Sequence, residues 1–201
     1  GTRIVSSKLI SATGSKPKVL AVGPWLYILF TYTTGGNKYV YFSRLNVATP
    51  STISAAAVLL IDGLVSGTPY WGAVTIGQNF AVVYNNASTT HVVLQVISTD
   101  GVLGTGDTLP APADVSGASI ATLTALNLAC HQDRYLYVLV GTSDPDAQVA
   151  VYDCDLSVTR ALSTIGTPSG SVVQITAAEV SATLPTMRVV YEATASVTYK
   201  H

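Results

Sequence analysis

The sequence predicts an all-β, β-propeller-like protein of about four blades, each with up to four antiparallel strands. Two observations carry this prediction. Strand-forming residues dominate in short runs bounded by Gly, Pro, Asn, Asp and Ser, and no stretch sustains the i, i+3, i+4, i+7 pattern of an amphipathic helix. In addition, hairpin-like segments recur at a nearly constant spacing, which is typical of a repeat architecture.

Four hairpins make up the repeat. Each consists of an apolar strand, a short turn rich in glycine or polar residues, and a second apolar strand. Their first strands align at Leu26, Phe80, Leu136 and Val189, which are 54, 56 and 53 residues apart. The middle of a propeller blade is covered on both faces by neighbouring blades, so these continuous apolar runs are expected for its inner and middle strands.

Further strands flank each hairpin. A short apolar strand precedes each one, at 19–22, 73–76, 126–130 and 172–176. A weaker and more polar segment follows the first three, at 53–61, 102–109 and 161–165. Polar residues suit the outer edge of a blade, because they discourage pairing with another chain. This accounts for four strands in each of the first three units.

The repeats predict one propeller domain, or a fragment of one, over residues 1–201. The approximate repeats are 17–66, 70–115, 120–168 and 170–201. The last repeat lacks an outer strand, and a strand-like segment at 3–13 precedes the first, so we expect residues 3–13 to complete the last blade and close the ring. Consecutive blades of a larger ring and a pair of β-sandwiches remain open as alternatives.

The composition bears on the partners. Only 10% of residues are charged, with ten Lys plus Arg against eleven Asp plus Glu and no basic cluster. We therefore expect no nucleic-acid partner and no anionic membrane partner. The longest apolar run, 19–32, is broken by Gly23-Pro24 and is too short for a spanning helix, which predicts a soluble chain. Two cysteines, Cys130 and Cys154, are better explained as free thiols than as a disulfide.

Motifs for catalysis are missing from the sequence. The sequence has no G-x-S-x-G motif whose serine could use His91, His131 or His201 as a catalytic base. The histidines and cysteines also lack the spacing of zinc ligands. Most Asp residues stand where turns explain them. A propeller glycosidase would need an arginine cluster and Asp-box turns, and segment 98–101 only begins like such a turn. The sequence therefore predicts no catalytic residues, no metal, no cofactor and no enzyme.

Aromatic residues are the best candidates for a binding site. Trp25, Trp71, Tyr70 and Tyr135 lie near the starts of the predicted inner and middle strands. Such rings can stack on sugar rings, and they can equally be wedges that fill the space between blades. These four residues are the binding residues that the sequence predicts.

The texture of the chain adds a resemblance. With strands rich in Ser, Thr, Ala and Val, scarce charge, and imperfect repeats such as Val40-Tyr41-Phe42-Ser43-Arg44-Leu45-Asn46, the chain resembles the β-propeller region of bacteriophage tail proteins of the nozzle or tubular type. The resemblance implies a structural component of the virion, a contact platform that meets other structural subunits in a homo-oligomeric assembly. A carbohydrate-binding propeller, lectin-like or receptor-binding, is the alternative function, with glycans as partners. A glycosidase is the third.

Overall fold

The computed structural model of the chain describes residues 14–50, 53–54, 57–58, 69–86, 91–98, 111–144, 146–181, 186–194 and 196–200. The regular elements in these residues are all β-strands, and they form four antiparallel sheets. In every sheet the order of the strands in space is their order along the chain. Consecutive strands therefore pair through hairpins, as the turn residues between them predict.

The strands of the first two sheets are β1 (Ser15–Val22), β2 (Trp25–Thr34), β3 (Asn37–Asn46) and β4 (Ala57–Val58), then β5 (Trp71–Ile76), β6 (Asn79–Asn85), β7 (His91–Ile97) and β8 (Ala113–Ser119). The third sheet holds β9 (Leu123–His131), β10 (Tyr135–Thr142), β11 (Ala147–Tyr152) and β12 (Val158–Gly166), and the fourth holds β13 (Val172–Ser181), β14 (Thr186–Ala193) and β15 (Ser196–Lys200).

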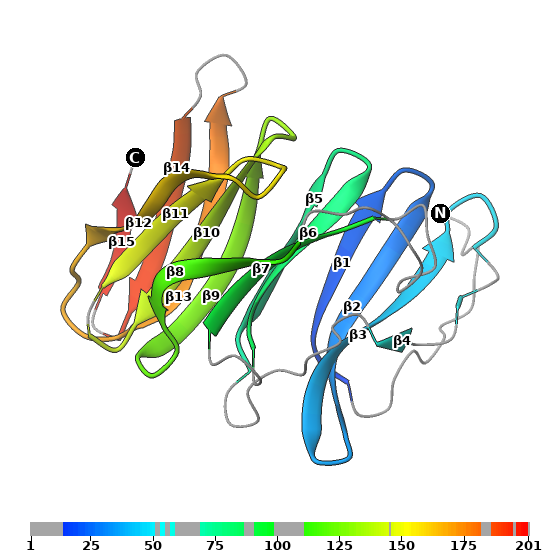
Figure 1. The fold of residues 1–201 in the computed structure, drawn as a ribbon, viewed down its shortest axis with the longest axis horizontal. Coiled ribbons are helices and arrows are strands. Elements are labelled where there is room, and N and C mark those ends of the chain that lie inside the picture. The colour runs from blue at the N-terminus through cyan, green and yellow to red at the C-terminus, as the bar shows by residue number, and fades with distance from the viewer. Residues whose placement is uncertain are drawn as a thin grey trace.

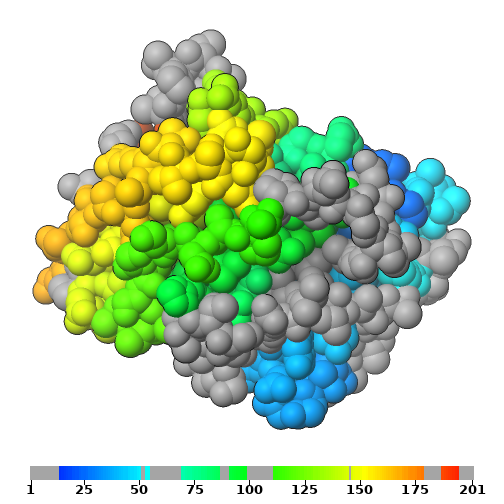
Figure 2. All heavy atoms as spheres, viewed as in Figure 1, coloured from blue at the N-terminus to red at the C-terminus, as the bar shows by residue number. Residues whose placement is uncertain are grey.

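The four sheets stack face to face in chain order, like the blades of a fan (Figure 1). The first sheet and the fourth lie at opposite ends of this fan. Inner strands of successive sheets contact one another, β1 with β5, β5 with β9 and β9 with β13. The outer strands β8 and β12 also touch, and Figure 2 shows the green second sheet meeting the yellow third sheet along one face.

Three hydrophobic clusters fill the three spaces between the sheets. Strand β6 explains how, because successive side chains of a strand point to opposite faces. Phe80 and Val82 join the cluster against the first sheet, whereas Ala81 and Val83 join the cluster against the third. The third cluster joins the third and fourth sheets through residues such as Ile175. Burial on both faces is the physical reason for the continuous apolar runs in the sequence.

The predicted fold class is confirmed: the chain is all-β and propeller-like, with four antiparallel sheets of up to four strands. Two β-sandwiches would bury two separate interfaces, whereas these sheets share three in succession. The four predicted inner strands lie within β1, β5, β9 and β13. The boundaries of the repeats stay a prediction, and the segment 3–13 that was expected to close the ring lies outside the described residues.

The outer strands are the least well predicted part. The third one, predicted at 161–165, lies within β12, but the first is described as a strand only at Ala57–Val58. The predicted segment 102–109 lies outside the described residues, and the outer strand of the second sheet is β8, further along the chain. Val115 is the one fully buried hydrophobic residue of β8. An edge strand that buries so little has no hydrophobic period by which to find it.

Glycine lets the inner strands come close together. A Cβ placed on Gly72 of β5 would lie 2.7 Å from Cα of Asn127 and 2.8 Å from the backbone nitrogen of Leu128, both on β9. Real Cβ atoms do not approach backbone this closely, so a side chain at this position would push the second and third sheets apart. Gly72 therefore helps to set the spacing of the inner strands at which the candidate site is built.

Candidate functional site

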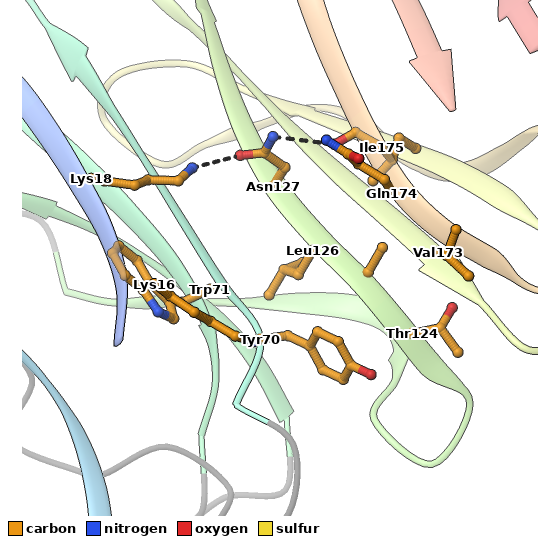
Figure 3. A pocket seen from close by; sticks show the side chains of 11 residues that line it. Lys16, Lys18, Tyr70, Trp71, Thr124, Leu126, Asn127, Val173, Gln174 and Ile175 are labelled. Carbon is orange, nitrogen blue, oxygen red and sulfur yellow. Dashed lines mark hydrogen bonds between the residues drawn. The ribbon is translucent and has the colours of Figure 1, made fainter. Parts of the chain in front are cut away.

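A cavity of about 240 Å³ lies where the inner strands of all four sheets meet (Figure 3). Its wall is made by β1, by β5 with the residue before it, by β9 and by β13. The lining residues are Lys16, Lys18, Tyr70, Trp71, Thr124, Ala125, Leu126, Asn127, Val173, Gln174 and Ile175. Inner strands surround the axis of a propeller, so this is the place where every sheet can contribute to one site. We refer to it as the inner-strand cavity.

A hydrogen-bonded chain crosses the inner-strand cavity. The Lys18 Nζ donates to Asn127 Oδ1 at 2.9 Å, and Asn127 Nδ2 donates to the backbone carbonyl of Ile175 at 3.1 Å. The same Oδ1 also accepts from the backbone N–H of Leu128 at 2.9 Å. One side-chain amide thereby links the first, third and fourth sheets, and its orientation is determined by these three partners.

Two lysines and two aromatic rings form the β1 side of the cavity. Lys16 Nζ donates to the carbonyl of Pro69 at 2.8 Å and lies 5.5 Å from the ring centroid of Tyr70. Lys18 Nζ lies 5.9 Å from the ring centroid of Trp71. Burial lowers the pKa of both ammonium groups, and the nearby charge of Lys38 adds to this for Lys16. Each ammonium has three donors, so each retains N–H groups for a ligand.

The opposite side of the cavity is less polar. Thr124 Oγ1 donates to the carbonyl of Val172 at 2.6 Å, which joins β9 to β13. Val173 is 47% exposed and Gln174 is also exposed, so both are accessible from the opening. None of the described lining residues is Asp or Glu. The cavity therefore offers cations, an amide, a hydroxyl and aromatic surface.

The structure brings two of the four predicted binding residues together. Tyr70 and Trp71 both line the inner-strand cavity. Tyr70 is half-buried, whereas Trp71 is only 6% exposed and its Nε1 donates to Thr31 Oγ1 at 2.9 Å. Trp71 thus acts largely as a wedge between the first two sheets, with one face toward Lys18.

The other two predicted residues lie elsewhere. Trp25 begins β2 and its ring stacks with the Arg44 guanidinium at 4.6 Å. Tyr135 begins β10 and its ring lies 5.0 Å from the guanidinium of Arg134. Neither residue lines the inner-strand cavity. The role of both rings in binding stays a prediction.

Sequence reasoning missed the polar residues of the cavity. Lys18, Asn127 and Gln174 each stand within or beside an apolar inner strand, at positions facing the point where the sheets converge. A polar residue that interrupts a strand covered on both faces needs a partner or a ligand. That interruption was the signal available in the sequence, and it would have drawn attention to Asn127 within 126–130 and Gln174 within 172–176.

A second cavity, of about 280 Å³, lies between the third and fourth sheets. Tyr137, Arg160 and Met187 line it together with aliphatic side chains of β11 and β14. Burial raises the pKa of the Tyr137 hydroxyl, with the neighbouring Tyr135 as a second cause. Only two sheets contribute to this space, and most of its wall is apolar, so it offers fewer groups to orient a ligand than the inner-strand cavity does.

Three other features bear on function. Within the described part of the chain, no three His, Cys, Asp or Glu side chains are grouped so that they could hold a metal ion. No helix among the described residues is long and apolar enough to cross a membrane. Cys130 and Cys154 are not joined by a disulfide.

Comparison with known proteins supports the fold. No protein-family model and no curated protein matches this sequence. Among solved structures, the chain is similar to the catalytic domain of the GH62 alpha-L-arabinofuranosidase of Coprinopsis cinerea, with a TM-score of 0.52, 10% identity, and coverage of 96% of this chain and 63% of that one. It is also similar to a subtype N10 neuraminidase-like protein of A/little yellow-shouldered bat/Guatemala, with a TM-score of 0.52, 12% identity, and coverage of 93% and 57%.

The chain spans less than two thirds of the length of either solved structure. At these identities the likeness establishes the fold. It also contradicts the prediction that the protein is not an enzyme, because the first of these structures is by name a catalytic domain. That prediction relied on missing local motifs. In a fold whose site draws single residues from several sheets, functional residues are scattered along the chain and form no local motif.

The comparisons do not bear on the resemblance to phage tail proteins. A virion location, structural subunits as partners and a homo-oligomeric assembly stay predictions from the sequence. The same holds for the expected absence of nucleic-acid and membrane partners.

Proposed function

We propose that this chain is a carbohydrate-binding β-propeller that holds a sugar in the inner-strand cavity. The observation that carries the proposal is the combination, in one cavity, of an accessible aromatic ring with polar side chains that neighbouring strands hold in place. Ligand sites are typically concave, largely apolar surfaces with a few well-placed polar groups. Sugar binding is also a property that a lectin-like propeller and a glycosidase share.

Tyr70 supplies the surface for the sugar ring. Its backbone N–H donates to Asn85 Oδ1 at 3.0 Å, and its carbonyl accepts from the backbone N–H of Asn85 at 3.1 Å. This pair of bonds fixes the residue at the start of β5, and its ring projects into the cavity (Figure 3). Because the backbone that carries the ring is already ordered, binding a ligand does not have to pay for ordering it.

The polar groups supply the orientation. Lys16, Lys18 and Asn127 surround the aromatic side, and each is hydrogen-bonded to protein in the absence of ligand. Hydroxyl groups of a sugar can accept from the remaining ammonium N–H groups and donate to carbonyl oxygens at the rim. The volume of about 240 Å³ lies just below that of typical sites for drug-sized molecules, which suits one sugar ring.

The likeness to solved structures supports the proposal at the level of fold. An arabinofuranosidase catalytic domain and a neuraminidase-like protein share this arrangement of sheets. The proposal itself depends on Tyr70 and its polar neighbours, since the fold alone does not specify a ligand.

The test is a titration of the whole chain with a panel of neutral and acidic oligosaccharides. Trp25 and Trp71 are the two tryptophans of the chain, so the variant Trp25→Phe makes Trp71, at the cavity wall, the sole tryptophan reporter. We expect its fluorescence to change on adding a bound glycan, with calorimetry giving the affinity. Measuring reducing ends in the same samples distinguishes binding alone from binding followed by hydrolysis.

Two matched variants locate the site. Tyr70→Ala should weaken glycan binding about tenfold or more, because it removes the stacking surface and the hydrophobic contact. Tyr32→Ala removes the same side chain from a half-buried position on β2, outside the cavity, and should leave the affinity unchanged. The proposal is wrong if no glycan binds, or if both variants lose the same amount of binding.

A further inference from the structure

We infer that the ligand of the inner-strand cavity is an acidic carbohydrate, whose carboxylate or sulfate group lies between Lys16 and Lys18. This inference rests on the proposed function, since it assigns the class of sugar. Both lysines line the same cavity, two residues apart on β1. No Asp or Glu is found among the described residues that line it.

Both ammonium groups donate to neutral oxygens. Lys16 Nζ donates to the Pro69 carbonyl and Lys18 Nζ donates to the Asn127 amide oxygen. Elsewhere in the described residues the chain does pair its charges: Arg134 Nη2 lies 2.9 Å from Asp153 Oδ2. Lys18 is half-buried, and a half-buried cation beside a neutral acceptor costs free energy that an opposite charge would offset. Lys16 is exposed, so its charge is accessible to a ligand. An anion entering the cavity supplies the opposite charge.

The surroundings hold the two cations in place. Lys16 lies over the Tyr70 ring and Lys18 over the Trp71 ring, so the aromatic faces support both side chains without neutralising them. Asn127 is held by its bonds to Leu128 and Ile175 and keeps its oxygen toward Lys18. The positive end of the cavity is therefore built before the ligand binds.

The net charge of the whole chain does not reveal the positive charge of the inner-strand cavity. The chain as a whole carries a formal charge of −1 and no basic cluster, which is why the sequence predicted no nucleic-acid and no anionic membrane partner. A cavity with two cations and no described carboxylate has the opposite local sign. Its position at the convergence of the inner strands concentrates the positive potential in a partly desolvated space.

Lysine ammonium groups act as point charges and do not select the planar shape of a carboxylate as arginine does. The shared chemistry of the ligand is thus a sugar with an anionic substituent, and the experiment has to separate carboxylate from sulfate. Three probes do this: an oligogalacturonate, its fully methyl-esterified counterpart, and a sulfated galactan oligosaccharide that has no carboxylate. The ester keeps the same sugar and removes only the charge.

Calorimetric titration of the full chain at low and high ionic strength tests the inference. We expect the oligogalacturonate or the sulfated galactan to bind at least about tenfold more tightly than the methyl ester, since the ester has no anion for a charge-assisted hydrogen bond. We expect added salt to weaken the binding of the acidic ligand and to leave the binding of the neutral ligand unchanged. Whichever acidic probe binds more tightly identifies the anionic group.

The variants Lys16→Met and Lys18→Met remove the charge and keep a long apolar side chain. Each should weaken binding of the acidic ligand about tenfold and binding of the ester by less, because the ester loses only a hydrogen bond to a neutral group. Lys18→Met should fold, because Asn127 Oδ1 still accepts from Leu128, and Lys18→Arg should keep the preference for acid. Arg188→Met makes the same charge change on an exposed residue of β14 outside the cavity, and it should have no effect.

Two results would overturn the inference: equal binding of the acid and its ester, or an equal loss of acid binding in Arg188→Met and Lys18→Met. If Tyr70→Ala still abolishes binding of a neutral glycan in either case, the proposed function stands and only the acidic class fails. If none of the three probes binds, the inference fails, and the proposed function fails with it only when the wider panel also shows no binding.

Discussion

Lys18 Nζ donates to Asn127 Oδ1 at 2.9 Å, although the two residues are 109 positions apart in the chain. The bond joins β1 of the first sheet to β9 of the third. Asn127 Nδ2 in turn donates to the Ile175 carbonyl of the fourth sheet. A single amide thus holds three of the four inner strands around the cavity, and it holds in place a cation that a ligand can reach.

Asn127→Asp tests this arrangement. The change keeps the shape of the side chain and places a carboxylate next to Lys18, so an ion pair within the protein replaces the site for an anion. We expect the affinity for an acidic oligosaccharide to fall about tenfold or more, while a neutral glycan is little affected. The carbonyl of Ile175 also loses its donor, which should cost about 1–2 kcal/mol of stability in urea denaturation. Unchanged affinity for acid would contradict the role given to Lys18.

As the pH rises, deprotonation of Lys18 should change the stability of the protein and its affinity for an acidic ligand in opposite directions. Burial lowers its pKa below the ordinary value of 10.5, so between the two values the unfolded chain binds more protons than the folded one. The free energy of unfolding contributed by Lys18 therefore rises with pH across that interval and is constant below it. The affinity for an acidic carbohydrate should fall as the pH rises across the same interval, because the Lys18 ammonium loses its charge.

The measurement is the difference between wild type and Lys18→Met, by urea denaturation and by titration with acidic ligand, from pH 7 upward. Taking the difference is necessary because burial raises the pKa of Tyr137 and Tyr152, and these tyrosines change stability in the opposite direction. If the difference in stability does not depend on pH below the ordinary lysine range, Lys18 is not desolvated in the folded protein.

Gly72→Ala should be strongly destabilising. Its Cβ would meet the backbone of Asn127 and Leu128 at 2.7 and 2.8 Å, and backbone in a paired strand cannot move aside cheaply. We expect a loss of about 3 kcal/mol, measured by chemical denaturation. Gly35→Ala is the control: nothing lies within 4 Å of its Cβ and only its φ of +57° is unfavourable, so about 1–2 kcal/mol should be lost. Equal losses would mean that the sheets can separate to accept a methyl group.

Trp71→Phe should destabilise the interface between the first two sheets. Trp71 Nε1 donates to Thr31 Oγ1, and Thr31 is itself buried at 3% exposure. The smaller ring leaves that hydroxyl without its donor, and we expect a loss of about 2 kcal/mol. A double-mutant cycle with Thr31→Val isolates the hydrogen bond, for which we expect a coupling of about 1 kcal/mol. A coupling near zero would assign the whole effect to packing.

Part of this architecture is visible along the chain. The strands 73–76 and 172–176 were predictable because residues covered on both faces form continuous apolar runs, and the hairpins because their turns carry glycine and asparagine. The outer strand β8 was not, since it buries little beyond Val115. The pattern of hydrophobic residues along a strand reflects which side chains are buried. A strand that is hardly buried therefore has no such pattern by which to recognise it.

The candidate site divides in the same way. Tyr70 and Trp71 were predictable as aromatic candidates, because both stand at the start of an apolar inner strand. That they share a cavity with Lys16, Lys18 and Asn127 was not, because those residues come from different sheets. Nor did composition reveal the local positive charge, since it reports only the total of −1.

The sequence by itself determined the fold class, the inner and middle strands and their hairpins, because these depend on neighbours within about ten residues and on burial that repeats along the chain. Only the tertiary structure decided which side chains meet. The contact between Lys18 and Asn127 depends on the stacking angle of three sheets and on the close approach that Gly72 permits. Neither the stacking angle nor the close approach can be derived from a local segment of the sequence, and both determine the chemistry of the cavity.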